Sequence, residues 1–164
     1  MNDILEAIGA SPIGTFMAEN ATAFPWVETV HVVAITTVIG VIAIVDLRLI
    51  GVASRSYSIS RLTKALLPLT WGGFALAALS GSLLFASQPV TYFNNFAFRM
   101  KMVLLLAAGL NMAVFHLLTM RGISLWDRDA KVPLAAKAAG LSSMVIWVAI
   151  VALGRWIGFT MSPF

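Results

Sequence analysis

The fold class of this chain is decided by residues 26–49, which read WVETVHVVAITTVIGVIAIVDLRL. This stretch is longer than the about 20 mostly apolar residues that a transmembrane helix needs. Its Val, Ile and Leu residues are distributed all round a helix rather than along one stripe, which excludes a soluble amphipathic helix. The segment is therefore predicted to cross a membrane.

Three further stretches have the same character, at about 65–86, 98–120 and 138–158. Each is long enough for a hydrocarbon layer of about 30 Å at about 1.5 Å per residue. The alternating ten-residue segments of a transmembrane barrel are not seen. We predict an all-α fold, in which residues 1–164 form one integral membrane domain built as a four-helix transmembrane bundle.

Composition excludes the main alternatives. Of the 164 residues, 60% are hydrophobic and 11% are charged, whereas a soluble domain has about 25% charged residues. High hydrophobicity also excludes a disordered chain, and a net charge of +4 that is spread thinly speaks against binding to nucleic acid. The chain has no cysteine, which excludes disulfides, zinc–thiolate sites and iron–sulfur clusters.

Lysine and arginine in the short loops predict the orientation, because cytoplasmic loops are the more basic ones. The loops after the first and third spans hold most of these residues: Arg48, Arg55, Arg61, Lys64, Arg121, Arg128, Lys131 and Lys137. The opposite side holds Arg99, Lys101 and Arg155. Both termini are therefore predicted to be periplasmic.

Residues 1–25 carry acidic residues and no basic one, unlike the start of a signal peptide. Their apolar residues (Ile4, Leu5, Ile8, Phe16 and Met17) could lie on the outer membrane surface. We predict a short interfacial helix here.

Small residues recur every four positions in the second span, at Gly73, Ala77 and Gly81. Such a face lets two helix backbones approach closely in lipid. Packing inside one bundle is the favoured interpretation, and an interface with a second chain is the alternative.

Ionisable groups are costly inside a bilayer and indicate function or tight pairing. Asp46 and Arg48 close the first span but are two residues apart, so they do not face each other. We predict a structural, anchoring role for both.

The two histidines are predicted to lie at different depths. His31 is ~6 Å inside one face and His116 is ~27 Å along its helix from that face, so the rings are separated by roughly 20 Å. They cannot both bind one haem iron. They mark two sites, or one is structural, or a partner chain supplies the missing ligand.

A cofactor site is predicted at the outer level. His31 would be an axial ligand of a b-type haem, with Lys101 and Arg155 neutralising the propionates. His116 is a candidate ligand for a second site. Copper(I) is the alternative metal, held by His31 with thioether ligands from Met100, Met102 and Met161. A purely hydrogen-bonded, structural histidine is the third interpretation, and it is favoured for His116.

Three runs resemble an uncharacterised bacterial family of four-helix inner-membrane proteins, described only as a domain of unknown function. These runs are TAFPWVETVHVVAITTVIGVIAIVDLRLIG, FAFRMKMVLLLAAGLNMAVFH and GRWIGF, at 22–51, 96–116 and 154–159. The resemblance implies a multi-pass protein of the bacterial inner (plasma) membrane and brings no established activity.

A looser set of positions is similar to the copper-resistance D membrane family and to the membrane-bound, haem-carrying protoporphyrinogen oxidase family. The positions are His31, Gly40 and Arg48 in the first span, and Lys101, Asn111 and His116 in the third. Those families tend to have a Trp seven residues after the first histidine, and here that residue is Val38. This departure weakens an assignment to porphyrinogen oxidation.

The leading functional hypothesis is a small membrane protein that binds haem b and takes part in electron transfer, alone or as an accessory subunit. The second is a non-catalytic subunit or assembly factor, which would pack as a homo-oligomer or in a larger membrane complex through the Gly73, Ala77 and Gly81 face. The third is copper handling through His31 and the outer methionines.

Overall fold

The computed structural model describes residues 2–53, 56–127 and 132–161, and these ranges contain helices and turns but no strand. The predicted all-α fold is confirmed. Three of the basic residues used for the predicted orientation (Arg55, Arg128 and Lys131) lie outside the described residues.

Four long helices form the bundle, and each is long and apolar enough to cross a membrane. They are α3 (Ala23–Ile50), α4 (Ile59–Ser87), α6 (Phe96–Val114) and α7 (Leu134–Met161). α6 continues into a π-helical turn, η1 (Phe115–Thr119), and a 3₁₀ segment, η2 (Met120–Leu125). Each predicted span lies inside one of these helical stretches.

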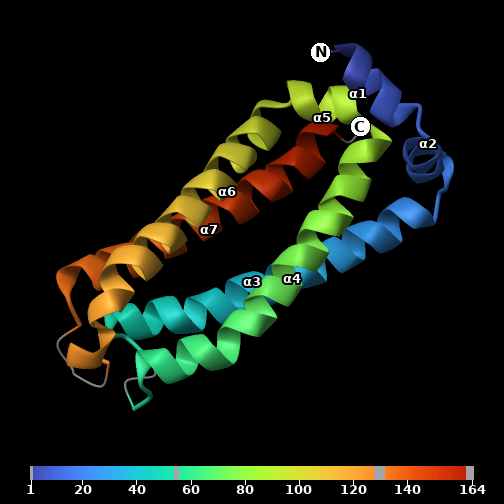
Figure 1. The fold of residues 1–164 in the computed structure, drawn as a ribbon. Coiled ribbons are helices and arrows are strands. Elements are labelled where there is room, and N and C mark those ends of the chain that lie inside the picture. The colour runs from blue at the N-terminus through green and yellow to red at the C-terminus, as the bar shows by residue number, and fades with distance from the viewer. Residues whose placement is uncertain (1, 54–55, 128–131, 162–164) are drawn as a thin grey trace.

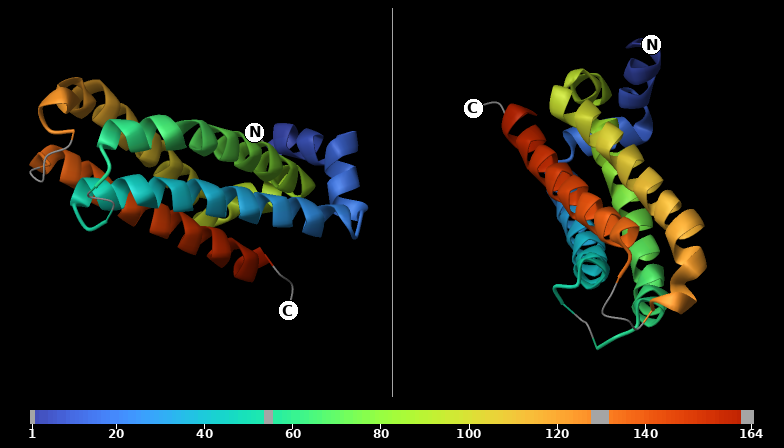
Figure 2. Two further views of the ribbon diagram at one scale, coloured as in Figure 1. Left: turned by 90° about the horizontal axis from the view of Figure 1, so that it is seen from below. Right: turned by 90° about the vertical axis from the view of Figure 1, so that its left-hand side faces the viewer.

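The bundle is open on one side (Figures 1 and 2). α3 packs against α4 and α7, and α6 packs against α7, whereas contacts between α4 and α6 are sparse. α1, α2, α5 and the end of α7 lie together at one end, the terminal end (Figure 1). We call the opposite end, where α3 connects to α4 and η2 leads to α7, the loop end.

The terminal end is covered by α1 (Asn2–Gly9), α2 (Pro12–Glu19) and α5 (Pro89–Asn94). The stretch predicted as one short helix is thus two helices, since the Ser11 side chain caps α2 by accepting from Gly14 N at 3.1 Å. Leu5 and Met17 are buried against the protein, and Ile4 and Phe16 are exposed. Part of this apolar surface therefore packs on the bundle.

α3 and α4 pack through the small-residue face. A Cβ atom on Gly73 would lie 2.9 Å from Cγ2 of Val38, and one on Gly81 would lie 2.9 Å from Cε1 of His31. The favoured interpretation, packing inside one bundle, is confirmed. Because α3 covers this face, it is not free for a second chain, and a homo-oligomer or larger membrane complex stays a prediction.

Replacing Gly73 with alanine is expected to destabilise the protein by about 2 kcal/mol, because Val38 is buried and cannot retreat from the added methyl group. Gly72 is the matched control, since a Cβ there meets nothing within 4 Å. Alanine is the better helix former, so Gly72→Ala should be neutral or slightly stabilising. Thermal unfolding of both variants in detergent measures the difference; equal midpoints would contradict the close packing.

A hydrophobic core lies at the loop end and joins α3, α4, η1 and α7. It consists of Leu49, Ile59, Phe115, Trp126, Val132 and Ala136. Arg48 is buried here, and its Nε donates to the carbonyl of Tyr57 at 2.9 Å. Arg48 therefore anchors the end of α3 to the loop that follows it.

The Asp127 carboxylate holds the start of α4. It accepts from Ser60 N at 2.8 Å and from Ser60 Oγ at 2.5 Å, while the Asp127 carbonyl accepts from Ile59 N at 3.3 Å. A carboxylate at a helix N-terminus satisfies free N–H groups and interacts well with the helix dipole. We call these hydrogen bonds the Asp127 clip. The clip joins α4 to the segment after α6, although α4 and α6 have few direct contacts.

Candidate functional site

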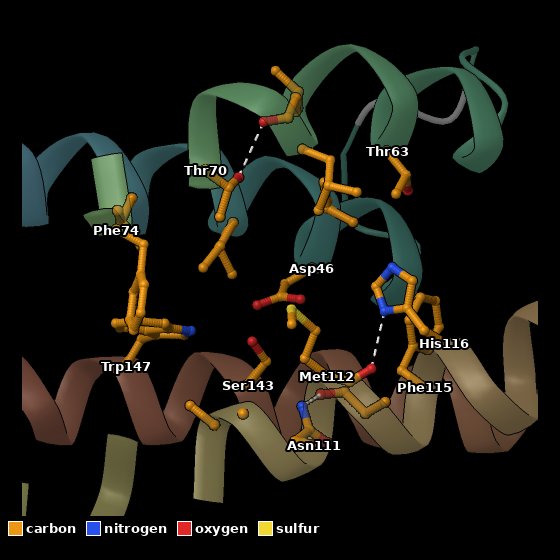
Figure 3. Close-up of a pocket in the computed structure, with 18 of the residues that line it drawn as sticks. Asp46, Thr63, Thr70, Phe74, Asn111, Met112, Phe115, His116, Ser143 and Trp147 are labelled. Atoms are coloured by element: carbon orange, nitrogen blue, oxygen red, sulfur yellow. Dashed lines mark hydrogen bonds between the residues drawn. The ribbon is translucent and has the colours of Figure 1, made fainter. Parts of the chain in front are cut away.

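An apolar pocket of about 300 Å³ occupies the loop-end half of the bundle (Figure 3). Its walls come from all four long helices. The polar, aromatic and exposed residues that line it are Asp46 on α3, Thr63, Thr70, Trp71 and Phe74 on α4, Gly109, Asn111, Met112, Phe115 and His116 on α6 and η1, and Ser143 and Trp147 on α7.

The pocket opens between α4 and α6. Its exposed lining residues lie on these two helices: Trp71 and Phe74 on α4, and Gly109 and Met112 on α6. The lining residues of α3 and α7 are buried or half-buried. Since the outer surfaces of α4 and α6 are apolar at this level, the mouth of the pocket faces the hydrocarbon layer that surrounds the bundle.

Three buried side-chain atoms in the described part of the chain have no hydrogen-bond partner: Asp46 Oδ2, Thr63 Oγ1 and His116 Nε2. All three residues line this pocket. Leaving a buried polar atom unpaired costs about 1–3 kcal/mol. Three such atoms lie around one cavity, and a polar group placed in it, from water or from a ligand, would satisfy them.

The π-helical turn sets the orientation of His116. A π-turn in an otherwise α-helical segment is rare and frequent at functional sites. His116 Nδ1 lies 2.9 Å from the Met112 carbonyl (Figure 3). A carbonyl can only accept, so Nδ1 carries a proton, and in the neutral imidazole Nε2 is then a lone-pair acceptor.

The Asp46 side chain lies in the middle of the pocket wall and points toward the Ser143 hydroxyl of α7 (Figure 3). Only 5% of Asp46 is exposed. Asn111 has a hydrogen-bond partner within the protein. Its Nδ2 donates to the Ala139 carbonyl at 3.0 Å, and this bond connects α6 to α7. Among the polar lining residues, Asp46 is thus the buried carboxylate directed at the cavity.

Aromatic rings form much of the remaining wall. Trp71 and Phe74 on α4 meet edge to face, with ring centroids 6.3 Å apart, and Trp147 on α7 and Phe115 on η1 also line the pocket. Flat apolar walls with a few convergent polar atoms are typical of small-molecule sites.

The predicted outer site is at the terminal end, where His31 on α3 and Lys101 on α6 are both half-buried. His31 Nδ1 is 2.9 Å from Ser80 Oγ, and the ring lies against Gly81. The Lys101 ammonium is close enough for its charge to act on the His31 ring. It also lies beside Gly154, where a Cβ would be 3.6 Å from Nζ.

Arg155 does not join this group. Its side chain is exposed and its guanidinium lies over the Phe159 ring, 4.7 Å from the centroid. Burial raises the pKa of the nearby Tyr92 phenol in α5, and the charge of Glu28 raises it further. The terminal end therefore holds charges of both signs, with His31 and Lys101 turned inward.

A cluster of three or more His, Cys, Asp or Glu residues that could hold a metal ion is absent from the described ranges. Of the methionines predicted to assist His31, Met100 and Met161 are half-buried and Met102 is 36% exposed. Copper binding by a histidine and thioethers stays a prediction.

The pocket was found only in part by sequence reasoning. His116 was predicted as a candidate ligand for a second site, and it lines this pocket. The sequence predicts an anchoring role for Asp46 and gives no signal for Thr63 and Ser143. The signal for Asp46 was present, because a carboxylate inside an apolar span usually marks a functional site.

The fold and the pocket define a membrane-spanning four-helix protein with a cavity inside its bundle. The chain belongs to a family of unknown function (DUF6644), whose model matches residues 11–160. The predicted membership of an uncharacterised family is thereby confirmed, while the likeness to the copper-resistance and protoporphyrinogen oxidase families stays a prediction. No curated protein and no solved structure matches the chain.

Proposed function

We propose that this protein binds a hydrophobic molecule, taken from the bilayer, in the pocket between α4 and α6. The observation that carries the proposal is the convergence of Asp46 Oδ2, Thr63 Oγ1 and His116 Nε2, all buried and unpaired, on one apolar cavity. A ligand with an apolar body and a small polar head would satisfy these atoms and fill the cavity.

The position of the mouth supports a ligand that travels in the membrane. A ligand pocket is usually about 300–1,000 Å³ and mostly apolar, with few polar groups that fix orientation. This cavity has about 300 Å³ and fits the lower part of that range. A ligand head would fill it, and an alkyl tail would leave between α4 and α6 into lipid.

The family resemblance and the distribution of basic residues support a place in the bacterial inner membrane, with the loop end on the cytoplasmic side. In this orientation the pocket lies in the cytoplasmic half of the bilayer, and the His31 end lies in the periplasmic half.

Filling the pocket tests the proposal. A Cβ on Gly109 meets nothing within 4 Å, and this residue lines the pocket. Gly109→Leu should fold normally and place its side chain across the mouth. Gly40→Leu is the matched control, since Gly40 also has open space but lies outside the pocket lining.

Both variants and the parent protein are purified from membranes in mild detergent, and bound hydrophobic molecules are extracted and identified by mass spectrometry. We expect a stoichiometric ligand in the parent protein and in Gly40→Leu, and at least a tenfold loss in Gly109→Leu. Equal ligand content in the two leucine variants would mean that the pocket is not the binding site.

A b-type haem with an electron-transfer role is the second candidate, and His116 supplies the observation that favours it. An axial histidine usually donates from one ring nitrogen to a carbonyl and binds iron through the other. His116 has Nδ1 held by Met112 and Nε2 free toward the pocket. His31 is the other predicted ligand, with Lys101 beside it.

Haem binding predicts a Soret band in protein purified after haem supplementation. His116→Ala should abolish the band if the haem is in the pocket, and His31→Ala should abolish it if the haem is at the terminal end. A spectrum without a Soret band would end the haem hypothesis and leave the hydrophobic-ligand proposal standing.

A further inference from the structure

We infer that the ligand is a quinol, that is, a 1,4-dihydroxy aromatic ring with an alkyl or isoprenoid tail, and that the site prefers this reduced form to the quinone. The inference rests on the proposed function and names its substrate class. It follows from which of the unpaired atoms can accept a hydrogen bond and which can donate one.

His116 requires a donor on the ligand. Its Nδ1 proton is used by the Met112 carbonyl at 2.9 Å, so in the neutral imidazole the buried Nε2 can only accept. A quinone carries two carbonyl oxygens, which also only accept, and one of them opposite Nε2 would leave both atoms unpaired. A quinol hydroxyl donates to Nε2 and removes that penalty.

In its ionised form, Asp46 provides a second acceptor on a different helix. Its Oδ2 is buried and unpaired on α3, whereas His116 belongs to η1. Figure 3 shows both side chains beside the same space, with Thr63 nearby on α4. Two hydroxyls on opposite edges of one ring can serve acceptors on two walls, and the Thr63 hydroxyl can donate to or accept from the head group.

The walls favour a flat ring over another kind of donor. An alkylammonium head could also donate to Asp46 and His116, but it has no planar surface. The pocket offers Trp71, Phe74 and Trp147 as ring surfaces, with Trp71 and Phe74 at a ring-centroid distance of 6.3 Å. Aromatic rings pack on one another in offset or edge-to-face geometry, which a quinol ring can do.

Four probes separate these possibilities: 2-decyl-1,4-hydroquinone, its quinone, its dimethyl ether and decylammonium. The ether keeps the ring and tail but has no donor. Binding of each to the detergent-purified, delipidated full-length protein is measured by native mass spectrometry under anaerobic conditions. We expect the hydroquinone to bind at least tenfold more tightly than the ether and the quinone.

Two threonines provide a matched pair of variants. Thr63 Oγ1 on α4 is unpaired and lines the pocket, whereas Thr36 on α3 lies outside the lining and donates to the Val32 carbonyl at 2.8 Å. Thr63→Val should weaken hydroquinone binding by about fivefold, the size of one hydrogen bond. It should leave ether binding unchanged, and Thr36→Val should change neither.

Each other outcome counts against the inference. Equal binding of hydroquinone and ether would mean that water satisfies the polar atoms, and tighter binding of decylammonium would make the ligand an amine. In both cases a loss of binding in Gly109→Leu would still support the pocket as a ligand site. If none of the probes binds and Gly109→Leu does not change ligand content, the proposed function itself fails.

Discussion

Replacing Gly14 with alanine is expected to release α2 from the bundle and to destabilise the protein by about 3 kcal/mol, at the upper end for overpacking. A Cβ at this position would lie 2.5 Å from the Gly9 carbonyl oxygen, 2.6 Å from that of Ile8 and 2.8 Å from that of Ala86. These are backbone atoms at the ends of α1 and α4, which cannot move aside as a side chain can.

Limited proteolysis and thermal unfolding check this expectation. Gly14→Ala should make residues 2–20 accessible to protease at low protease concentration and lower the unfolding midpoint. Gly158→Ala is the control at the same end of the bundle, because a Cβ there meets nothing within 4 Å. If Gly14→Ala is as resistant as this control, α2 does not pack as closely as described.

The fold was predictable from local composition. Apolar runs of about 20 residues specify transmembrane helices without knowledge of their neighbours, because lipid requires each helix to satisfy its own backbone. The same argument explains why Gly73, Ala77 and Gly81 predicted a helix contact, although their spacing alone could not show that α3 was the partner.

The N-terminal stretch was predicted less completely, because its structure depends on what it packs against. Ser11 and Pro12 mark the break between two helices. Burial of Leu5 and Met17, however, depends on α5 and α4 being nearby. Hydrophobicity gives the same signal for a side chain in lipid as for one in the protein.

The candidate site shows the same limit. Depth along a helix was predictable, and the two histidines do lie in opposite halves of the bundle, one beside Ser80 and the other in the pocket. Rotation about the helix axis was not predictable, and it turns Arg155 outward while it turns Thr63 inward. The π-turn that directs His116 also has no signature in the apolar sequence around it.

Replacing Asp127 with alanine is expected to destabilise the loop end by about 3 kcal/mol, because hydrogen bonds to a charged group contribute about 1.5–3 kcal/mol each. The carboxylate accepts from both the backbone and the hydroxyl of Ser60, and it stands at the start of α4, where the helix dipole favours a negative charge. Asp127→Asn should be intermediate, since an amide oxygen still accepts but carries no charge. Ser60→Ala should cost less, about 1–2 kcal/mol, because the backbone bond remains.

The Asp127 clip is also expected to affect ligand binding. Thr63 lies one turn after Ser60 on α4, and His116 lies on η1, so the position of α4 relative to η1 determines whether both can reach one head group. Few contacts between α4 and α6 exist to hold that position. Asp127→Ala is therefore expected to reduce ligand content several-fold in addition to lowering the unfolding midpoint, as measured by extraction and thermal unfolding of the same preparation. Gly14→Ala destabilises the terminal end through contacts with Gly9, Ile8 and Ala86, none of which line the pocket, and it provides the comparison. If it lowers ligand content as much as Asp127→Ala at equal loss of stability, general destabilisation and not the position of α4 would explain the effect.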